Sequence, residues 1–138
     1  MELIEGNFKG IQHIGLPVTN LERSIAFYKK LGFIPVMAAP FENENGIGQC
    51  CMVRRKDAIL ELYQLPKIEL HEIKKRGDGR IDHIAFDVND ISHAYNELMR
   101  AGFTIESKPA TLDFWDNGCQ YFTVIGPDGE RLEFNQIN

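Results

Sequence analysis

The sequence has few cysteines, no pair of cysteines at metal-binding spacing and no long hydrophobic run. Only three of its 138 residues are cysteine, and two of them, Cys50 and Cys51, are neighbours, where a disulfide would be strained. We therefore expect all three thiols, Cys119 included, to be reduced. The lack of a CxxC pair leaves a zinc knuckle or a dithiol redox motif with little support. No apolar stretch approaches the roughly 18 residues that a membrane-spanning helix needs.

Positive charge is also scarce. The 15 Lys and Arg residues are outnumbered by 20 Asp and Glu residues, which gives a formal net charge of −5. Nucleic acids and anionic membranes attract concentrated positive charge, so we expect neither as a partner and look instead for a small-molecule substrate. The first five residues resemble neither the basic nor the apolar part of a secretory signal, so we expect a cytoplasmic protein.

The rest of the composition is that of an ordinary globular domain, with 43% hydrophobic residues, and the informative feature is an internal repeat. Residues 11–18 (IQHIGLPV) match residues 81–88 (IDHIAFDV) at an offset of 70. A second set of matches follows at an offset of 72, with 60–62 over 132–134 and Gln64 over Gln136. One longer loop in the second copy would produce this change of offset.

Each copy has the pattern of a strand, a helix and three further strands. Helices are expected to begin at a capping side chain and to end at a glycine, running from Thr19 or Asn20 to Gly32 and from Asn89 or Asp90 to Gly102. The later strands are expected near residues 33–38, 47–54, 58–64, 103–107, 119–125 and 131–136. The sequence thus predicts an α+β domain over 1–138, with module one at about 8–66, a charged connector at 67–79 and module two at about 80–138.

The repeat also brings back one His and one Glu in each copy. His13 and His83 stand on the first strands, and Glu61 and Glu133 stand between apolar neighbours on the last strands. A lone His is more often a hydrogen-bonded core residue, but a buried Glu is costly unless it is paired or metal-bound. If the first and last strands of each copy are neighbours, each His faces its own Glu. Two such pairs supply two nitrogens and two oxygens, which suits a first-row divalent metal.

These segments resemble the vicinal oxygen chelate superfamily, which includes glyoxalase I, methylmalonyl-CoA epimerase, fosfomycin-resistance enzymes and extradiol dioxygenases. The segments that carry the resemblance are 13–18 with 21–28, 83–88, and 126–129 leading to Leu132 and Glu133. The resemblance implies two tandem βαβββ modules that form a curved, mixed β-sheet with a metal-binding cleft. It also implies one divalent ion (Zn, Ni, Co or Mn) held by His13, Glu61, His83 and Glu133.

The order His, Glu, His, Glu is similar to that of bacterial glyoxalase I. It implies a lyase or isomerase that removes a proton next to a metal-chelated carbonyl or hydroxyl group, with Glu133 as the favoured base and Glu61 as the opposing candidate. Where glyoxalase I holds glutathione with an Arg and an Asn, this chain has Pro17 and Leu65, so dependence on glutathione does not carry over. The alternatives are a non-haem iron dioxygenase and a metal-independent drug-binding protein of the same fold.

Other features have no counterpart in the repeat. The loop at 108–118 holds the only tryptophan, Trp115, which either contacts substrate or packs as a lid or at a dimer interface. His71 and His93 have no partner in the other copy, and we expect both at the surface. Modules of about 55 residues are near the lower limit for folding alone, which favours a homodimer or mutual dependence. The metal site then lies within one chain or is shared across the dimer.

Overall fold

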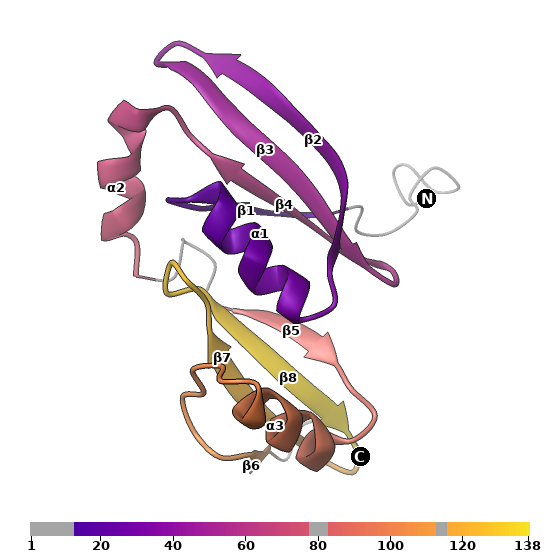
Figure 1. The fold of residues 1–138 in the computed structure, drawn as a ribbon. Coiled ribbons are helices and arrows are strands. Elements are labelled where there is room, and N and C mark those ends of the chain that lie inside the picture. The colour runs from indigo at the N-terminus through magenta and orange to yellow at the C-terminus, as the bar shows by residue number, and fades with distance from the viewer. Residues whose placement is uncertain (1–12, 78–82, 113–115) are drawn as a thin grey trace, which may run out of the picture. The chain divides into compact units, whose positions relative to one another are not determined.

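The chain forms two compact units that divide between Lys74 and Lys75, each built around a four-stranded mixed sheet (Figure 1). A computed structural model describes residues 13–77, 83–112 and 116–138. The predicted α+β class with two tandem modules is confirmed, while the metal-binding cleft stays a prediction.

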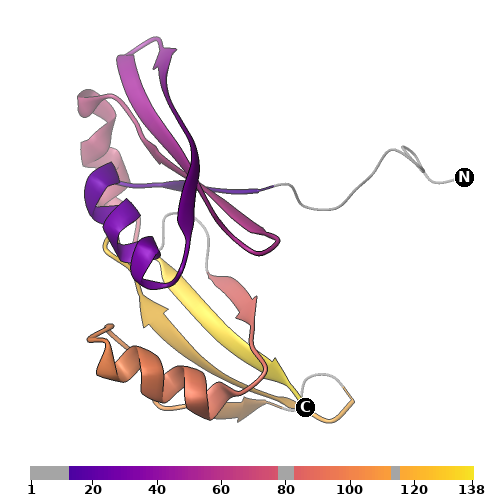
Figure 2. The same ribbon diagram turned by 45° about the vertical axis from the view of Figure 1, so that its right-hand side comes forward.

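The first unit has the strand order β1-β4-β3-β2, in which β1 lies parallel to β4 and the other neighbours are antiparallel. Helix α1 packs on one face of this sheet (Figure 2). Its elements are β1 (Ile14–Pro17), α1 (Leu21–Lys30), β2 (Ile34–Asn43), β3 (Gly46–Arg55) and β4 (Ala58–Gln64).

The second unit repeats this connectivity, with the strand order β5-β8-β7-β6 and a parallel β5–β8 pair. Helix α3 packs on one face of its sheet (Figure 2). The elements are β5 (Ile84–Asp87), α3 (Ile91–Arg100), β6 (Ala110–Leu112), β7 (Cys119–Ile125) and β8 (Arg131–Ile137). In both units the first and last strands are therefore neighbours, which is the arrangement that the His–Glu argument needs.

Alternation along the strands decides which face of each sheet is core. In the first unit Leu60 and Leu62 are buried, and Glu61 between them points to the opposite face. In the second unit Leu132 and Phe134 are buried around Glu133 in the same way, and Phe134 stacks on Phe122 with a centroid distance of 5.3 Å. The helix-covered face is thus apolar, while the Glu side chains stand on the other face.

The two helices of the repeat begin in matched ways. Asn20 accepts a hydrogen bond from Arg23 N at 3.0 Å, and Asp90 accepts one from His93 N at 2.9 Å, so the second of the two capping candidates is the cap in each copy. Each helix is followed two residues after its last residue by a glycine, Gly32 or Gly102, whose φ angles are +81° and +83°.

The matched glutamines fix the same helix starts from the last strand of each module. The Oε1 atom of Gln64 accepts a hydrogen bond from Leu21 N at 2.7 Å, and that of Gln136 accepts one from Ile91 N at 2.8 Å. These backbone donors lie in the first turn of a helix, where no carbonyl of the helix itself can accept from them. The sequence match between Gln64 and Gln136 at an offset of 72 thus has a structural cause, because both side chains accept a hydrogen bond from the first turn of a helix.

Replacing Gln136 by leucine should therefore destabilise the protein by about 1–3 kcal/mol, because the N–H of the buried residue Ile91 loses its acceptor. Urea unfolding followed by circular dichroism measures this difference. Gln49→Leu, at an exposed position of β3, is the matched control. Equal unfolding free energies for the two variants would contradict the role given to Gln136.

One strand prediction is wrong. The segment 103–107 holds only an isolated bridge between Ile105 and Val124, and the second strand of this unit along the chain is β6, inside the predicted loop 108–118. Both stretches lie along β7, but Pro109 separates them. Because proline has no N–H to donate to the ladder, the edge strand resumes only after it.

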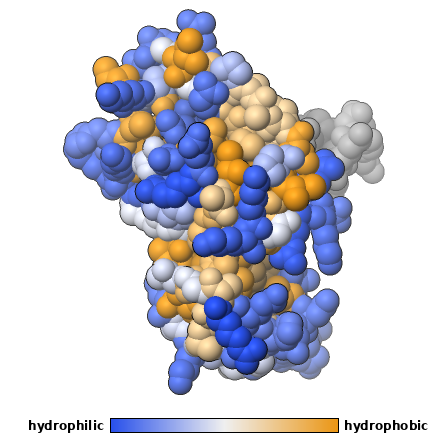
Figure 3. All heavy atoms as spheres, in the orientation of Figure 1, coloured by the Kyte–Doolittle hydropathy of each residue, from blue (hydrophilic) through white to orange (hydrophobic). Residues whose placement is uncertain are grey.

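The predicted connector contains two short helices, η1 (Lys67–Glu69) and α2 (Leu70–Lys75). Ile73 of α2 is buried, whereas Ile68 is one of the most exposed large apolar side chains, at 75%. None of the helices in the described residues is both long and apolar enough to cross a membrane. The face seen in Figure 3 is mostly hydrophilic, with smaller hydrophobic groups.

Candidate metal centre

In the first unit the structure brings His13 and Glu61 together. Gly15 of β1 is the register partner of Glu61 on β4, and residue 13 lies two positions earlier, so its side chain points to the same face of the sheet. The Nε2 atom of His13 lies 3.1 Å from Glu61 Oε2. The side chains are 30% and 29% exposed, so both can reach a ligand in solvent.

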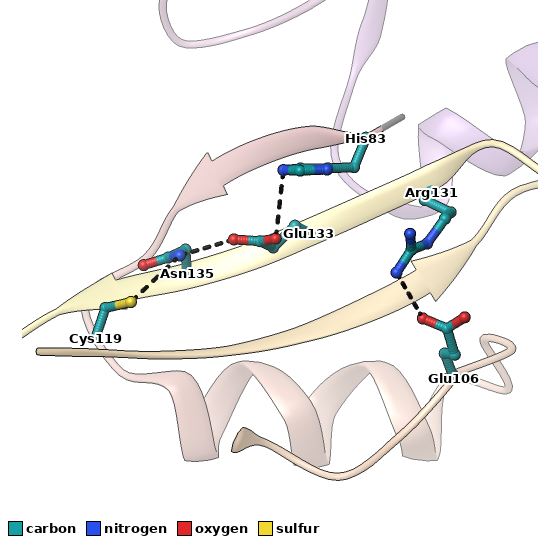
Figure 4. A network of polar contacts seen from close by, with 6 residues as sticks. All are labelled: His83, Glu106, Cys119, Arg131, Glu133 and Asn135. Carbon is teal, nitrogen blue, oxygen red and sulfur yellow. Dashed lines mark hydrogen bonds and ion pairs between the residues drawn. The ribbon is translucent and has the colours of Figure 1, made fainter. Parts of the chain in front are cut away.

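The second unit repeats the pair. Ala85 of β5 is the register partner of Glu133 on β8, and the Nε2 atom of His83 lies 3.6 Å from Glu133 Oε2 (Figure 4). Here the carboxylate is the more buried member, at 16% exposure against 43% for the imidazole. The same atoms, Nε2 and Oε2, face each other in both units.

A thiol contacts the first carboxylate. Cys50 Sγ donates a hydrogen bond to Glu61 Oε1 at 3.5 Å. Burial raises the pKa of Cys50 to about 11, with smaller contributions from the hydrogen bond to Glu61 and the charge of that carboxylate. The thiol is therefore protonated near neutral pH and acts as a donor. All three cysteines are free, as expected, and buried.

The space beside Glu61 depends on Gly15. A Cβ atom added at this glycine would lie 3.4 Å from Tyr63 Cε1 and 4.0 Å from Glu61 Oε2. The Tyr63 ring and the carboxylate thus stand on the same face of the sheet, above a residue without a side chain. The missing side chain leaves room for both groups over the parallel strand pair.

An amide contacts the second carboxylate. Asn135 Nδ2 donates to Glu133 Oε1 at 2.7 Å, and Cys119 Sγ lies 3.8 Å from the same nitrogen (Figure 4). The other amide atom, Asn135 Oδ1, is buried and has no hydrogen-bond partner in the described part of the chain. The ion pair between Arg131 and Glu106, at 3.1 Å, is separate from these contacts (Figure 4).

Imidazole nitrogen and carboxylate oxygen are ligands that suit Zn, Ni, Co and Mn, so the donors of each unit fit half of a first-row metal site. Three or more His, Cys, Asp or Glu side chains grouped for metal binding are not found among residues 13–77, 83–112 and 116–138. Each pair therefore supplies one nitrogen and one oxygen.

The sequence also singled out His71, His93 and Trp115, which belong to neither pair. His71 and His93 are exposed, as expected, and His93 Nε2 lies 3.9 Å from Glu97 Oε2 on the same helix. Trp115 lies outside the described residues. The internal repeat does not point to Cys50 or Asn135, because different residues, Phe122 and Tyr63, stand at the matching positions at an offset of 72.

Comparison with known proteins agrees with this fold. The chain belongs to the Glyoxalase/Bleomycin resistance protein/Dioxygenase superfamily, whose family model matches residues 10–134. It is 32% identical to the uncharacterised protein YwbC of Bacillus subtilis (strain 168) over 131 residues, covering 93% of this chain and 98% of that protein. It is 30% identical to the uncharacterised protein YwkD of the same organism, covering 91% and 94% of the two chains.

Solved structures share the fold at lower identity. A glyoxalase family protein from Enterococcus faecalis superimposes with a TM-score of 0.72 at 21% identity, over 93% of this chain and 98% of that one. A bleomycin resistance determinant encoded on the transposon Tn5 superimposes with a TM-score of 0.64 at 19% identity, with the same coverage. At these identities the likeness is one of fold.

Proposed function

We propose that the protein is a divalent-metal-dependent lyase or isomerase of the glyoxalase I type. The observation that carries this proposal is the repeated pair: in each unit an imidazole Nε2 and a carboxylate Oε2 face each other within 3.6 Å at matched positions. His13, Glu61, His83 and Glu133 would together hold one Zn, Ni, Co or Mn ion, within one chain or across a homodimer in the cytoplasm.

The roles of these four residues follow from the chemistry of their imidazole and carboxylate groups. When bound, the ion polarises the carbonyl and hydroxyl oxygens of a substrate and acidifies the neighbouring C–H group. The imidazoles of His13 and His83 would hold the ion through their nitrogen lone pairs. One carboxylate accepts the substrate proton and returns it to the adjacent carbon, and the resemblance favours Glu133 over Glu61 for this step.

The substrate class follows from two positions near the pairs. Pro17, which is buried, and Leu65 stand where glyoxalase I binds glutathione with polar side chains. Neither side chain has a group that can hydrogen-bond or ion-pair with a glutathione carboxylate or amide. A small hydroxycarbonyl compound that binds through its own two oxygens fits this site better than a glutathione adduct.

A metal-independent binding protein is the second candidate, since a bleomycin resistance determinant has the same fold. Such a protein does not need two matched His–Glu pairs, so the pairs favour the enzyme. A non-haem iron dioxygenase is distinguished by its use of oxygen. Metal analysis and an oxygen electrode separate all three functions.

The central test is proton exchange. The metal-loaded protein should exchange the α-proton of a hydroxycarbonyl compound with deuterated water, and the protein treated with a chelator should not. Proton NMR on a panel of such compounds measures the exchange. Methylglyoxal is tested both with and without glutathione. If it is a substrate, its turnover should not require glutathione. Absence of metal-dependent exchange across the panel would contradict the isomerase.

A further inference from the structure

The two carboxylates of the proposed metal site are held in different ways. Glu133 Oε1 accepts a 2.7 Å hydrogen bond from the Asn135 amide, whereas among the described residues the hydrogen-bond donor to Glu61 Oε1 is the Cys50 thiol, at 3.5 Å. An amide N–H is a good hydrogen-bond donor and a thiol is a weak one. Glu133 is also the less exposed of the two, at 16% against 29%.

The orientation of Asn135 is set by Glu133. Its Nδ2 atom faces the carboxylate, with Cys119 Sγ nearby, while its Oδ1 atom is buried without a hydrogen-bond partner among the described residues. Turning the amide over would place Oδ1 against the carboxylate oxygen, where two acceptors repel. The side chain thus leaves one buried oxygen unsatisfied and keeps its donor on Glu133.

Within residues 13–74 of the first unit, no amide side chain donates to Glu61. The residue matched to Asn135 is Tyr63, whose ring lies over Gly15 on the face that carries Glu61. A hydrogen bond to one carboxylate oxygen fixes the group and leaves the other oxygen for a metal ion. In the second unit that free atom is Oε2, the atom that faces His83.

We propose that Asn135 is a positioning residue that fixes Glu133 as a one-oxygen metal ligand and leaves Glu61 as the carboxylate that moves and accepts the substrate proton. This inference rests on the proposed metal-dependent function. It departs from the base that the family resemblance favours, because the contacts of this chain restrain Glu133 more than Glu61.

The test measures metal binding rather than turnover. Asn135→Leu, which keeps the approximate volume but has no donor, should lower Co²⁺ and Zn²⁺ affinity roughly 10–100-fold in a chelator competition. The visible spectrum of the Co²⁺-loaded variant should also change, because Glu133 Oε1 becomes free to bind the ion. Cys50→Ala, which removes the donor to Glu61, is the matched control and should change both quantities little.

Thermal unfolding of the metal-free variants separates folding from binding, and Asn135→Ala serves if the leucine variant does not fold. Wild-type affinity and an unchanged Co²⁺ spectrum in a folded Asn135 variant would overturn the positioning role while the metal site stands. Equal losses in the Cys50 and Asn135 variants would overturn the difference between the two carboxylates. Failure of the wild-type protein to bind either ion would overturn the proposed function itself, and this inference with it.

Discussion

Replacing His13 or His83 by alanine should lower the affinity for Zn²⁺ by more than ~100-fold. Loss of a residue that only hydrogen-bonds a metal ligand costs roughly 10–100-fold in affinity, and loss of the ligand itself removes a direct bond to the ion. Each His also faces a carboxylate, at 3.1 Å in one unit and 3.6 Å in the other, so its loss leaves Glu61 or Glu133 as the single donor of that pair. Chelator competition measures the affinity of each variant.

The same experiment has controls within the chain. His93→Ala removes an exposed imidazole of α3 whose nearest carboxylate is that of Glu97, at 3.9 Å, and His71→Ala removes an exposed imidazole of α2. Neither change should alter the affinity. The prediction also requires similar losses for the two repeat histidines, because the proposed ion would use both pairs. Wild-type affinity after either His13→Ala or His83→Ala would mean that the repeat pairs do not share a metal ion.

Much of this site can be predicted from the sequence because the chain contains the pattern twice. An offset of 70 aligns the two His residues, an offset of 72 aligns the two Glu residues, and a strand that alternates buried and exposed positions sets which face each side chain takes. The structure adds the reason that the pairs meet: β1 is parallel to β4, and β5 is parallel to β8. Matched glutamines hold the start of each helix against the same strands.

The parts that could not be predicted are those in which the copies differ. Asn135 and Cys50 reach a carboxylate from positions that hold other residues in the opposite copy, so no repeat marks them. The position of β6, the second strand of the second unit, differs from the prediction because Pro109 interrupts the edge of the sheet, and periodicity alone does not say on which side of a proline a short edge strand forms. The residues that differ between the copies therefore distinguish the surroundings of Glu61 from those of Glu133, which the matched residues do not.

Because Glu61 and Glu133 have different hydrogen-bond partners, replacing each by glutamine should have different effects. Glu61→Gln should slow metal-dependent proton exchange by about 10²–10⁴-fold at saturating metal, because an amide of the same shape cannot accept a proton from carbon. Glu133→Gln should lose more metal affinity and, once saturated, retain more exchange, since Glu133, which accepts a hydrogen bond from Asn135, is the carboxylate proposed as the fixed ligand. NMR exchange rates measured as a function of metal concentration separate the two losses.

A matched Glu→Gln change away from the pairs completes the comparison. Glu106 is exposed and contacts Arg131, so Glu106→Gln should leave both metal affinity and exchange unchanged. The opposite pattern, with exchange lost in Glu133→Gln and kept in Glu61→Gln at saturating metal, would assign the base as the family resemblance does. Loss of exchange in both variants at full metal occupancy would mean that both carboxylates take part in moving the proton, one on each side of the substrate carbon atoms. The expected pattern is loss of exchange in Glu61→Gln and retention of exchange in Glu133→Gln at saturating metal. Only this pattern, in which Glu61 alone is required for proton transfer, agrees with the unequal hydrogen bonds to the two carboxylates.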